Sequence, residues 1–374
     1  MPQPPFPSHL KTHRPNPEQE LLLQAALLKG DPARAAWEAW CAKVDLQTLD
    51  DGSFRLLPLL YQNLKALGVE HPWLQVMKGI HRHTWVKNQT LLHGMTPVLK
   101  MFQQAGIEPI VLKGTALITR YYENFGLRPM GDFDVLVPRQ SANQAIELLG
   151  QAGWTPGFRA PHAQVFRKSD GTECDLHWNL FFENCRVEVD DPFWQLAEPA
   201  KVGGVPVKVL NPTDQFLHVC VHGARWNPVP PLRWLADAVV ILEHSTIDWN
   251  RLVQQATRMG LVLPLRDTLG YLAWLLGVEV PEAVLAELNQ HLVSFAYRLD
   301  YRAWTVPPEQ RGPGLTLWAY WREFEQWSYG ADKSPHIWQF PQFLQHLWGV
   351  ESVHKIPWLV IAGGVRRLES QMKN

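Results

Sequence analysis

The chain has 374 residues, 46% of them hydrophobic, and its 35 Lys and Arg side chains nearly balance 36 Asp and Glu side chains, which leaves a formal net charge of −1. A chain of this length can bury a large core and form two or three domains, while its near-neutral charge gives no global electrostatic basis for binding a long polynucleotide. No stretch approaches the ~20 apolar residues that a transmembrane helix needs, so we expect no membrane span and small-molecule partners rather than extended nucleic acid.

Cysteine usage and the N-terminal residues bear on the cellular compartment. The four cysteines, at positions 41, 174, 185 and 220, show no C-x-x-C spacing, which is typical of reduced thiols in a cytoplasmic protein. Residues 1–18 are rich in proline and lack an apolar core, so we expect a flexible tail there rather than a signal peptide.

Residues 19–105 show apolar side chains at helical spacing and predict an N-terminal helical segment. Helices are expected over about 20–43, with a break at Gly30, and then over about 54–67 and 72–102. The three histidines at positions 81, 83 and 93 lack the spacing of a metal site, so we interpret them as surface or core residues.

Residues 106–210 alternate strands with helices and predict an α/β core. A strand over 110–112 leads through a Lys-Gly-Thr turn at 113–115 into a helix, and a second strand covers 133–137. Because alternate residues of a strand face the same side, Asp132 and Asp134 project together. Paired carboxylates repel each other unless cations lie between them, so this pattern indicates a divalent-metal site.

A third strand, over 172–180, places Glu173, Asp175 and His177 on one face. If it lies beside the strand that carries the paired acids, Asp175 reaches the same cations, with Glu173 as the alternative third acid. His177 would orient Asp175 or contact phosphate, or its role would be structural. Gly114 has no side chain and lets backbone N–H groups and a helix N-terminus approach a phosphate.

The remaining elements of this core follow from turn and cap residues. Ser141 is expected to cap a helix over 141–152. A strand over 162–168 turns at Asp170-Gly171 into the strand of Asp175, and residues 202–209 predict a second hairpin. The later edge of the sheet should therefore be mostly antiparallel.

Residues 211–374 predict a C-terminal helical domain. Thr213 is the expected cap of its first helix, and helices are expected over 213–224, 232–244, 248–259, 264–276 and 281–300. The stretch from about 305 to 374 has weak periodicity, and we interpret its apolar run at 356–365 as a docking helix rather than a membrane-surface segment.

Several polar side chains of this domain are candidates for a binding pocket. His218 and His222 are four residues apart, a spacing that places two ligands on one helix face, but no third ligand is evident, so we expect core or pocket-lining histidines. His222 and Asp237 would pair across neighbouring helices, either to brace the domain or to line the pocket. Arg225 and Arg233 would hold an anionic substrate or simply be solvated.

In this order, the motifs resemble the bacterial nucleotidyltransferase family five of the DNA polymerase β-like superfamily. The likeness rests on residues 112–114, Arg128, residues 131–134 and 175–178, and further on His222 and residues 233–237, 248–249 and 275–277. The superfamily usually has Gly-Ser at the first turn, where this chain has Lys113-Gly114-Thr115. Thr115 would replace the serine hydroxyl.

The resemblance implies an α+β fold with a nucleotidyltransferase-type mixed sheet, flanking helices, and helical segments before and after it. It also implies metal-dependent transfer of a nucleoside monophosphate from an NTP, such as ATP, to an acceptor hydroxyl or phosphate, with release of pyrophosphate. In this assignment Asp132, Asp134 and Asp175 hold two Mg²⁺ ions, with Mn²⁺ as the alternative, and Asp175 also positions or deprotonates the acceptor.

The same resemblance assigns the surrounding residues. Lys113, Gly114, Thr115 and Arg128 would bind the nucleotide, and the acceptor side would be formed by His177, His222, Arg225 and Asp237. Two alternatives stay open: a non-catalytic nucleotide-binding member of the same fold, and a toxin-like enzyme that modifies the 3′ end of tRNA.

Overall fold

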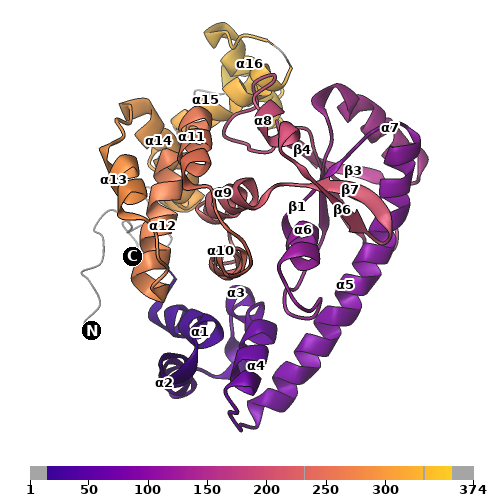
Figure 1. The fold of residues 1–374 in the computed structure, drawn as a ribbon. Helices are drawn as coiled ribbons and strands as arrows, with labels where there is room; N and C mark the ends of the chain where they lie inside the picture. Colours follow the sequence, from indigo (N-terminus) through magenta and orange to yellow (C-terminus); the bar gives the residue numbers. More distant parts are fainter. Residues whose placement is uncertain (1–14, 231, 332, 356–374) are drawn as a thin grey trace.

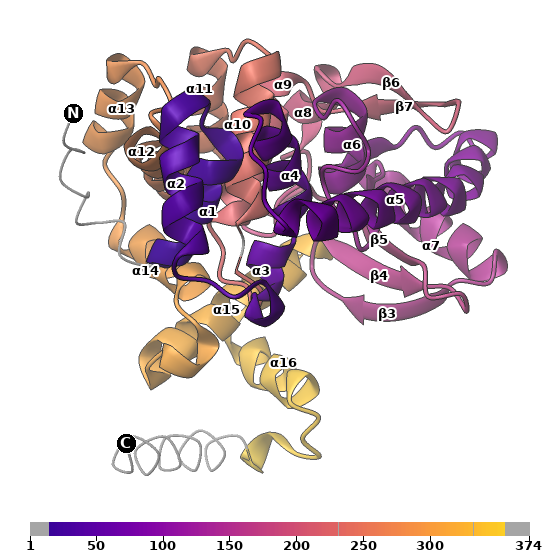
Figure 2. The same ribbon diagram turned by 90° about the horizontal axis from the view of Figure 1, so that it is seen from below.

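A computed structural model describes residues 15–230, 232–331 and 333–355, which form N-terminal helices, a mixed sheet and a set of C-terminal helices (Figure 1). The N-terminal helices are α1 (Pro17–Leu27), α2 (Gly30–Cys41), α3 (Asp51–Phe54), α4 (Leu57–Ala66) and α5 (Trp73–Gln104). The long helix α5 runs from the N-terminal helices along the sheet, and the two views agree on this (Figures 1 and 2).

The first helix begins earlier than the sequence pattern predicts. The Asn16 side chain accepts a hydrogen bond from the Gln19 N–H at 2.8 Å, and the Gln19 side chain accepts one from the Asn16 N–H at 2.9 Å. This reciprocal cap, with Pro17 as the first helical residue, starts α1 inside the segment expected to be a tail. Residues 1–14 of that predicted tail lie outside the described part of the chain.

Seven strands form one mixed sheet, which confirms the predicted α+β class. They are β1 (Ile110–Leu112), β2 (Phe133–Leu136), β3 (Thr155–Arg159), β4 (Ala163–Arg167), β5 (Glu173–His177), β6 (Glu198–Val202) and β7 (Val205–Val209). The order across the sheet is β3-β4-β5-β2-β1-β7-β6. β2 pairs with β5 and β1 with β7 in parallel, and the other neighbours are antiparallel.

The two predicted hairpins connect β4 to β5 and β6 to β7. At the second turn Gly203 and Gly204 both have positive φ, +55° and +79°, a conformation that glycine adopts without strain. The helices α6 (Lys113–Arg120), α7 (Ala142–Gln151) and α8 (Asp191–Gln195) complete this part of the chain. Ser141 precedes α7, but its side chain makes no capping hydrogen bond, because a 3₁₀ turn over Arg139–Ser141 runs directly into the helix.

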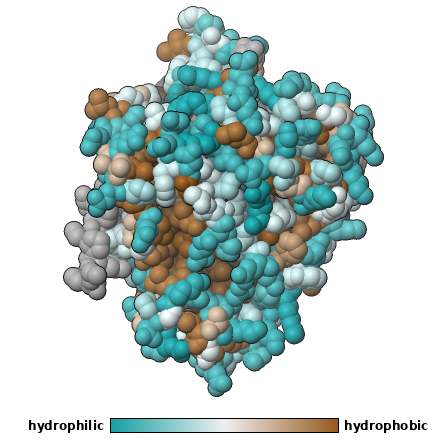
Figure 3. All heavy atoms as spheres, in the orientation of Figure 1, coloured by the Kyte–Doolittle hydropathy of each residue, from teal (hydrophilic) through white to brown (hydrophobic). Residues whose placement is uncertain are grey.

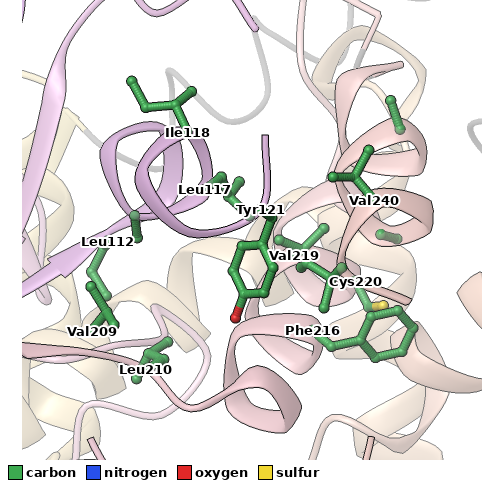
Figure 4. Close-up of a cluster of buried hydrophobic side chains, with 14 of the residues drawn as sticks. Leu112, Leu117, Ile118, Tyr121, Val209, Leu210, Phe216, Val219, Cys220 and Val240 are labelled. Carbon is green, nitrogen blue, oxygen red and sulfur yellow. The ribbon is translucent and has the colours of Figure 1, made fainter. Parts of the chain in front are cut away.

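The C-terminal helices pack against this sheet through α6, α9 and α10. The helices are α9 (Pro212–Gly223), α10 (Arg233–His244), α11 (Trp249–Met259), α12 (Val262–Leu276), α13 (Glu282–Gln290), α14 (Phe295–Thr305), α15 (Pro313–Gly330) and α16 (Phe340–Leu347). Figure 4 shows Leu117 and Tyr121 beside Val219 and Cys220, so one buried apolar cluster joins the two parts. This contact fixes where the helical part stands relative to the strands.

Several expectations for the helical part were wrong in detail. The cap of α9 is Asn211, which accepts from the Asp214 N–H at 3.1 Å, whereas the Thr213 hydroxyl accepts from the Asp248 N–H at 2.9 Å. The helix expected over 281–300 is two helices, because Ser294 caps α14 and restarts the chain. The predicted docking helix at 356–365 lies outside the described residues.

Two surface properties complete the description. On the face seen in Figure 3 hydrophilic side chains dominate, and hydrophobic ones gather in a hollow near α10 and α12. Among the residues that the structure describes, no helix has the length and apolar character needed to cross a bilayer.

Candidate active site

Asp134 of β2 and Asp175 of β5 stand directly opposite each other in the parallel pairing of the two strands. They therefore share one face of the sheet. Asp132 precedes β2, and all three acids line one cavity of about 1040 Å³. Between Asp132 and Asp134, Phe133 is fully buried on the other side of the strand. The structure thus brings together the three acids that the sequence singled out.

Glu173, the alternative third acid, lies outside the cavity. Its carboxylate pairs with Arg167 at 2.5 Å at the exposed hairpin end of β4 and β5. Asp175 is therefore the acid of β5 that joins the paired aspartates.

Three side chains of types that can hold a metal ion come together at the same place. One ligand atom each from Asp134, Asp175 and His177 lie within 4.8 Å of one another, and His177 Nε2 is 3.2 Å from Asp134 Oδ1. Adjacent ligands of an octahedral ion with bonds of roughly 2.1 Å stand about 3 Å apart, so this spacing fits a divalent cation. Asp132 lines the cavity but is not part of this group. The third member of the group is His177 instead.

Burial, mutual repulsion and the neighbouring Lys113 set the electrostatics of the three acids. Lys113 has a left-handed φ of 43° at the end of β1, and its Nζ lies 2.5 Å from Asp134 Oδ1. Burial works against ionisation of Asp134, but the Lys113 ammonium and the His177 ring together outweigh it and lower the pKa of that carboxyl. Burial and repulsion from Asp134 raise the pKa of Asp175 to about 7, and the same two causes raise the pKa of Asp132.

The turn at Gly114 needs a residue without a side chain. A Cβ at this position would lie 2.8 Å from Arg128 Nη1 and 2.8 Å from Met130 Sδ, which is closer than van der Waals contact allows. Gly114 lines the cavity at the N-terminal end of α6, where backbone N–H groups are free to meet an anion.

Thr115 does not occupy the position predicted for it. Its side chain is 1% exposed, and its hydroxyl is directed at Met130 Sδ, 4.0 Å away. Because α6 begins at Lys113, the helix turns Thr115 into the core rather than toward the cavity. A direct contact between its hydroxyl and a triphosphate, as the sequence suggested, does not fit this placement.

Arg128 forms an ion pair with Asp237, which the sequence analysis assigned to the acceptor side. Asp237 binds it through two hydrogen bonds, from Nε at 2.7 Å and from Nη2 at 2.9 Å, and accepts a third from the Tyr122 hydroxyl at 2.7 Å. The predicted pairing of Asp237 with His222 is not seen among the described residues; the carboxylate instead binds Arg128 and Tyr122. Arg128 Nη1 is left beside Gly114.

The other predicted acceptor-side residues also line the cavity or lie next to it. Arg225 forms a bidentate pair with the buried Glu183. His222 is exposed to the cavity and stacks on His218, with ring centroids 6.2 Å apart. Burial lowers the pKa of His218 to about 3, so that ring is neutral. The expectation of pocket-lining histidines fits these positions.

The cavity also contains residues that the sequence did not identify. Asn88 of α5 is fully buried and donates to the backbone oxygens of Phe125 at 2.6 Å and Arg128 at 2.8 Å. It also accepts from the Met130 N–H at 3.2 Å. Asn88 therefore fixes both ends of the loop that carries Arg128.

Further lining residues come from the N-terminal helices, namely Arg55, Val76, Gly79, Ile80, His83, Thr84 and Lys87. Those on α5 recur at intervals of three or four residues and form one face of the helix. This periodicity is visible in the sequence, but it does not show that the face turns toward the acids.

Comparison with known proteins finds a family for this chain. A family model described as an uncharacterised nucleotidyltransferase matches residues 53–277, more than half of the chain. Comparison with curated proteins finds no match.

Two solved structures are similar to parts of this chain. One is the crystal structure of an antigenic nucleotidyltransferase-like protein from Paracoccidioides brasiliensis, with 14% identity, a TM-score of 0.35, and coverage of 52% of this chain and 96% of that one. The other is the solution structure of the antibiotic-resistance factor ANT(2'')-Ia, with 12% identity, a TM-score of 0.30, and coverage of 58% and 95%. On the family match, the chain belongs to the uncharacterised nucleotidyltransferase family.

Proposed function

We propose that this protein transfers a nucleoside monophosphate from an NTP to an acceptor hydroxyl or phosphate and releases pyrophosphate. The observation that carries the proposal is the register of β2 and β5, which sets Asp134 and Asp175 side by side on the cavity with Asp132 next to them. Converging carboxylates are what metal-assisted displacement at phosphorus requires.

Divalent cations fit the donor set. Asp134, Asp175 and His177 would hold one ion, and Asp132 with Asp134 would hold a second, as two Mg²⁺ or Mn²⁺ ions. When bound, such ions stabilise the charge that develops on the α-phosphate and on the leaving oxygen. Burial and the Lys113 ammonium lower the pKa of His177, which leaves its imidazole neutral and able to act as a ligand.

The residues of the chain then have separate tasks. The acceptor oxygen forms a new bond to the α-phosphorus, the bond from that phosphorus to the bridging oxygen breaks, and pyrophosphate leaves with the electron pair. Asp175 takes the proton of an acceptor hydroxyl. The N–H groups at Gly114 and Nη1 of Arg128, which line the cavity side by side, would bind the triphosphate.

The cavity supports a small acceptor. Its volume of about 1040 Å³ is at the upper end for small-molecule sites, which accommodates a nucleotide together with a second small molecule. Four free cysteines, three of them buried, are in keeping with action in the cytoplasm.

The test is transfer of label from α-³²P NTPs to a panel of aminoglycosides, sugars, peptides and tRNA in the presence of Mg²⁺ or Mn²⁺. Label transfer and pyrophosphate release are expected from the wild type and from Glu173→Gln, and neither from Asp134→Asn. NTP binding without transfer to any acceptor would instead support a non-catalytic nucleotide-binding protein.

A further inference from the structure

The basic side chains of the cavity divide into two groups. Among the described residues six lysines and arginines line it. Lys113, Arg128 and Arg225 each pair with a carboxylate, from Asp134, Asp237 and Glu183 respectively. Arg55, Lys87 and Arg233 have no carboxylate partner in the part of the chain that the structure describes.

Arg233 is the most constrained of the unpaired group. It begins α10, is half-buried, and its Nη1 donates to the backbone oxygen of Pro129. Burial, together with repulsion from Arg128 and Arg55, lowers its pKa to about 10 against the attraction of Asp237 and Asp132, so it stays charged at neutral pH. Three positive groups lie close together here, and only Arg128 has a carboxylate partner among the described residues, which favours the binding of an anion between them.

Arg128, Arg233 and Arg55 follow one another away from the turn at Gly114. Arg128 Nη1 is beside Gly114, and Arg233 is tied to Pro129, the residue after Arg128. Arg55 follows α3, and α3 touches the segment before α10, since a Cβ on Gly52 would lie 2.4 Å from the backbone oxygen of Pro230. The row therefore starts at the proposed position of the nucleotide and ends in the N-terminal helices.

We propose that Arg233 and Arg55 continue the row from Arg128 and bind the β- and γ-phosphates of the NTP, and then the pyrophosphate leaving group. Planar guanidinium groups match phosphate oxygens in pairs of hydrogen bonds. The inference rests on the proposed function for the identity of the substrate. An acceptor phosphate is the other source of the same chemistry, but the row begins at Gly114 and Arg128, which favours the polyphosphate tail.

Binding of inorganic tripolyphosphate with Mg²⁺, measured by calorimetry, isolates this subsite because the ligand has no base, sugar or acceptor. Arg55→Gln and Arg233→Gln are each expected to weaken tripolyphosphate binding about tenfold or more, and Arg55→Lys to restore part of the loss. Binding of a nucleoside monophosphate, which lacks the distal phosphates, should change less than twofold. Arg82→Gln, at an exposed arginine of α5 outside the cavity, is the control.

The proposal is overturned if Arg55→Gln melts like the wild type and binds tripolyphosphate with unchanged affinity. It is also overturned if the substitutions weaken only the binding of the acceptor. If Arg233→Gln disturbs the fold by removing the hydrogen bond to Pro129, Arg55→Gln alone decides the test. Because the experiment measures binding alone, a protein that transfers no nucleotide can still confirm the subsite. Nucleotide transfer with the same KM for NTP in Arg55→Gln would reject the subsite and leave the proposed function intact.

Discussion

Asp134 and Asp175 face each other across adjacent parallel strands, and the like charge of the first contributes to raising the pKa of the second to about 7. Replacing either acid by asparagine should lower the rate of nucleotide transfer at least ~100-fold, because a carboxylate that would hold the divalent cations is lost. In the metal-free protein Asp175→Asn should melt no lower than the wild type, because it removes a repulsion. Lower melting together with retained transfer would contradict the assignment of Asp175.

The ion pair of Arg128 and Asp237 should dominate local stability. Both side chains are almost fully buried, with 9% and 4% exposed, so Asp237→Asn leaves a guanidinium without its counter-ion and should cost about 3–5 kcal/mol of unfolding free energy. Glu173→Gln breaks the exposed pair with Arg167, which water screens, and should cost far less. Urea unfolding of both variants measures the difference, and equal losses would show that burial does not set the strength of these pairs.

Gly114→Ala should impair the nucleotide site. The added methyl group would be 2.8 Å from Arg128 Nη1, so Arg128 must move away from the turn. We expect NTP affinity to fall about tenfold or more, as for the loss of a charge-assisted hydrogen bond. Gly150→Ala is the control, because no atom lies within 4 Å of its added Cβ in α7 and the change should leave NTP binding as it is. Equal NTP affinity in both variants would contradict this account.

Asp190 should make stability depend on pH. Burial raises the pKa of its carboxyl to about 6, although Oδ2 accepts hydrogen bonds from Asn179 and the Leu180 N–H; Oδ1 has no partner. Between its unfolded value near 3.9 and about 6, the folded protein holds a proton that the unfolded chain has released. Stability from this group is therefore present at low pH and falls as pH rises through that window.

Asp190→Asn removes that dependence. The variant should gain roughly 1–3 kcal/mol over the wild type at pH 7.5, from about 1.4 kcal/mol per unit of pKa shift, and nothing at pH 4. Denaturant unfolding at both pH values tests this. A gain of the same size at pH 4 would mean that the amide stabilises the site by hydrogen bonding rather than by removing a buried charge.

Local patterns were sufficient to predict the acids and the glycine turn. Neighbours in the sequence are enough to show the alternation around Asp132 and Asp134 and the strand that carries Asp175. The structure brings these residues together. Thr115 was misplaced because the exact start of α6 decides which way its side chain turns, and a one-residue difference is enough.

Other parts depend on contacts between distant residues. Nothing near Asn88 in the sequence shows that its amide meets a loop some forty residues away, and nothing near Asp237 shows that Arg128 takes both of its oxygens. The helix α15 was not predicted, although it is regular. Its sequence is rich in aromatic residues, and side chains of mixed size leave little apolar periodicity.

The three hydrogen bonds of Asn88 have a consequence for how the protein can be divided. The loop that carries Arg128 takes its shape from a side chain of α5, which belongs to the N-terminal helices. A fragment cut at residue 106 would retain every acid of the sheet yet lose the anchor that sets Arg128 beside the turn. The strands and α5 therefore depend on each other, and engineering that exchanges one must carry the other with it.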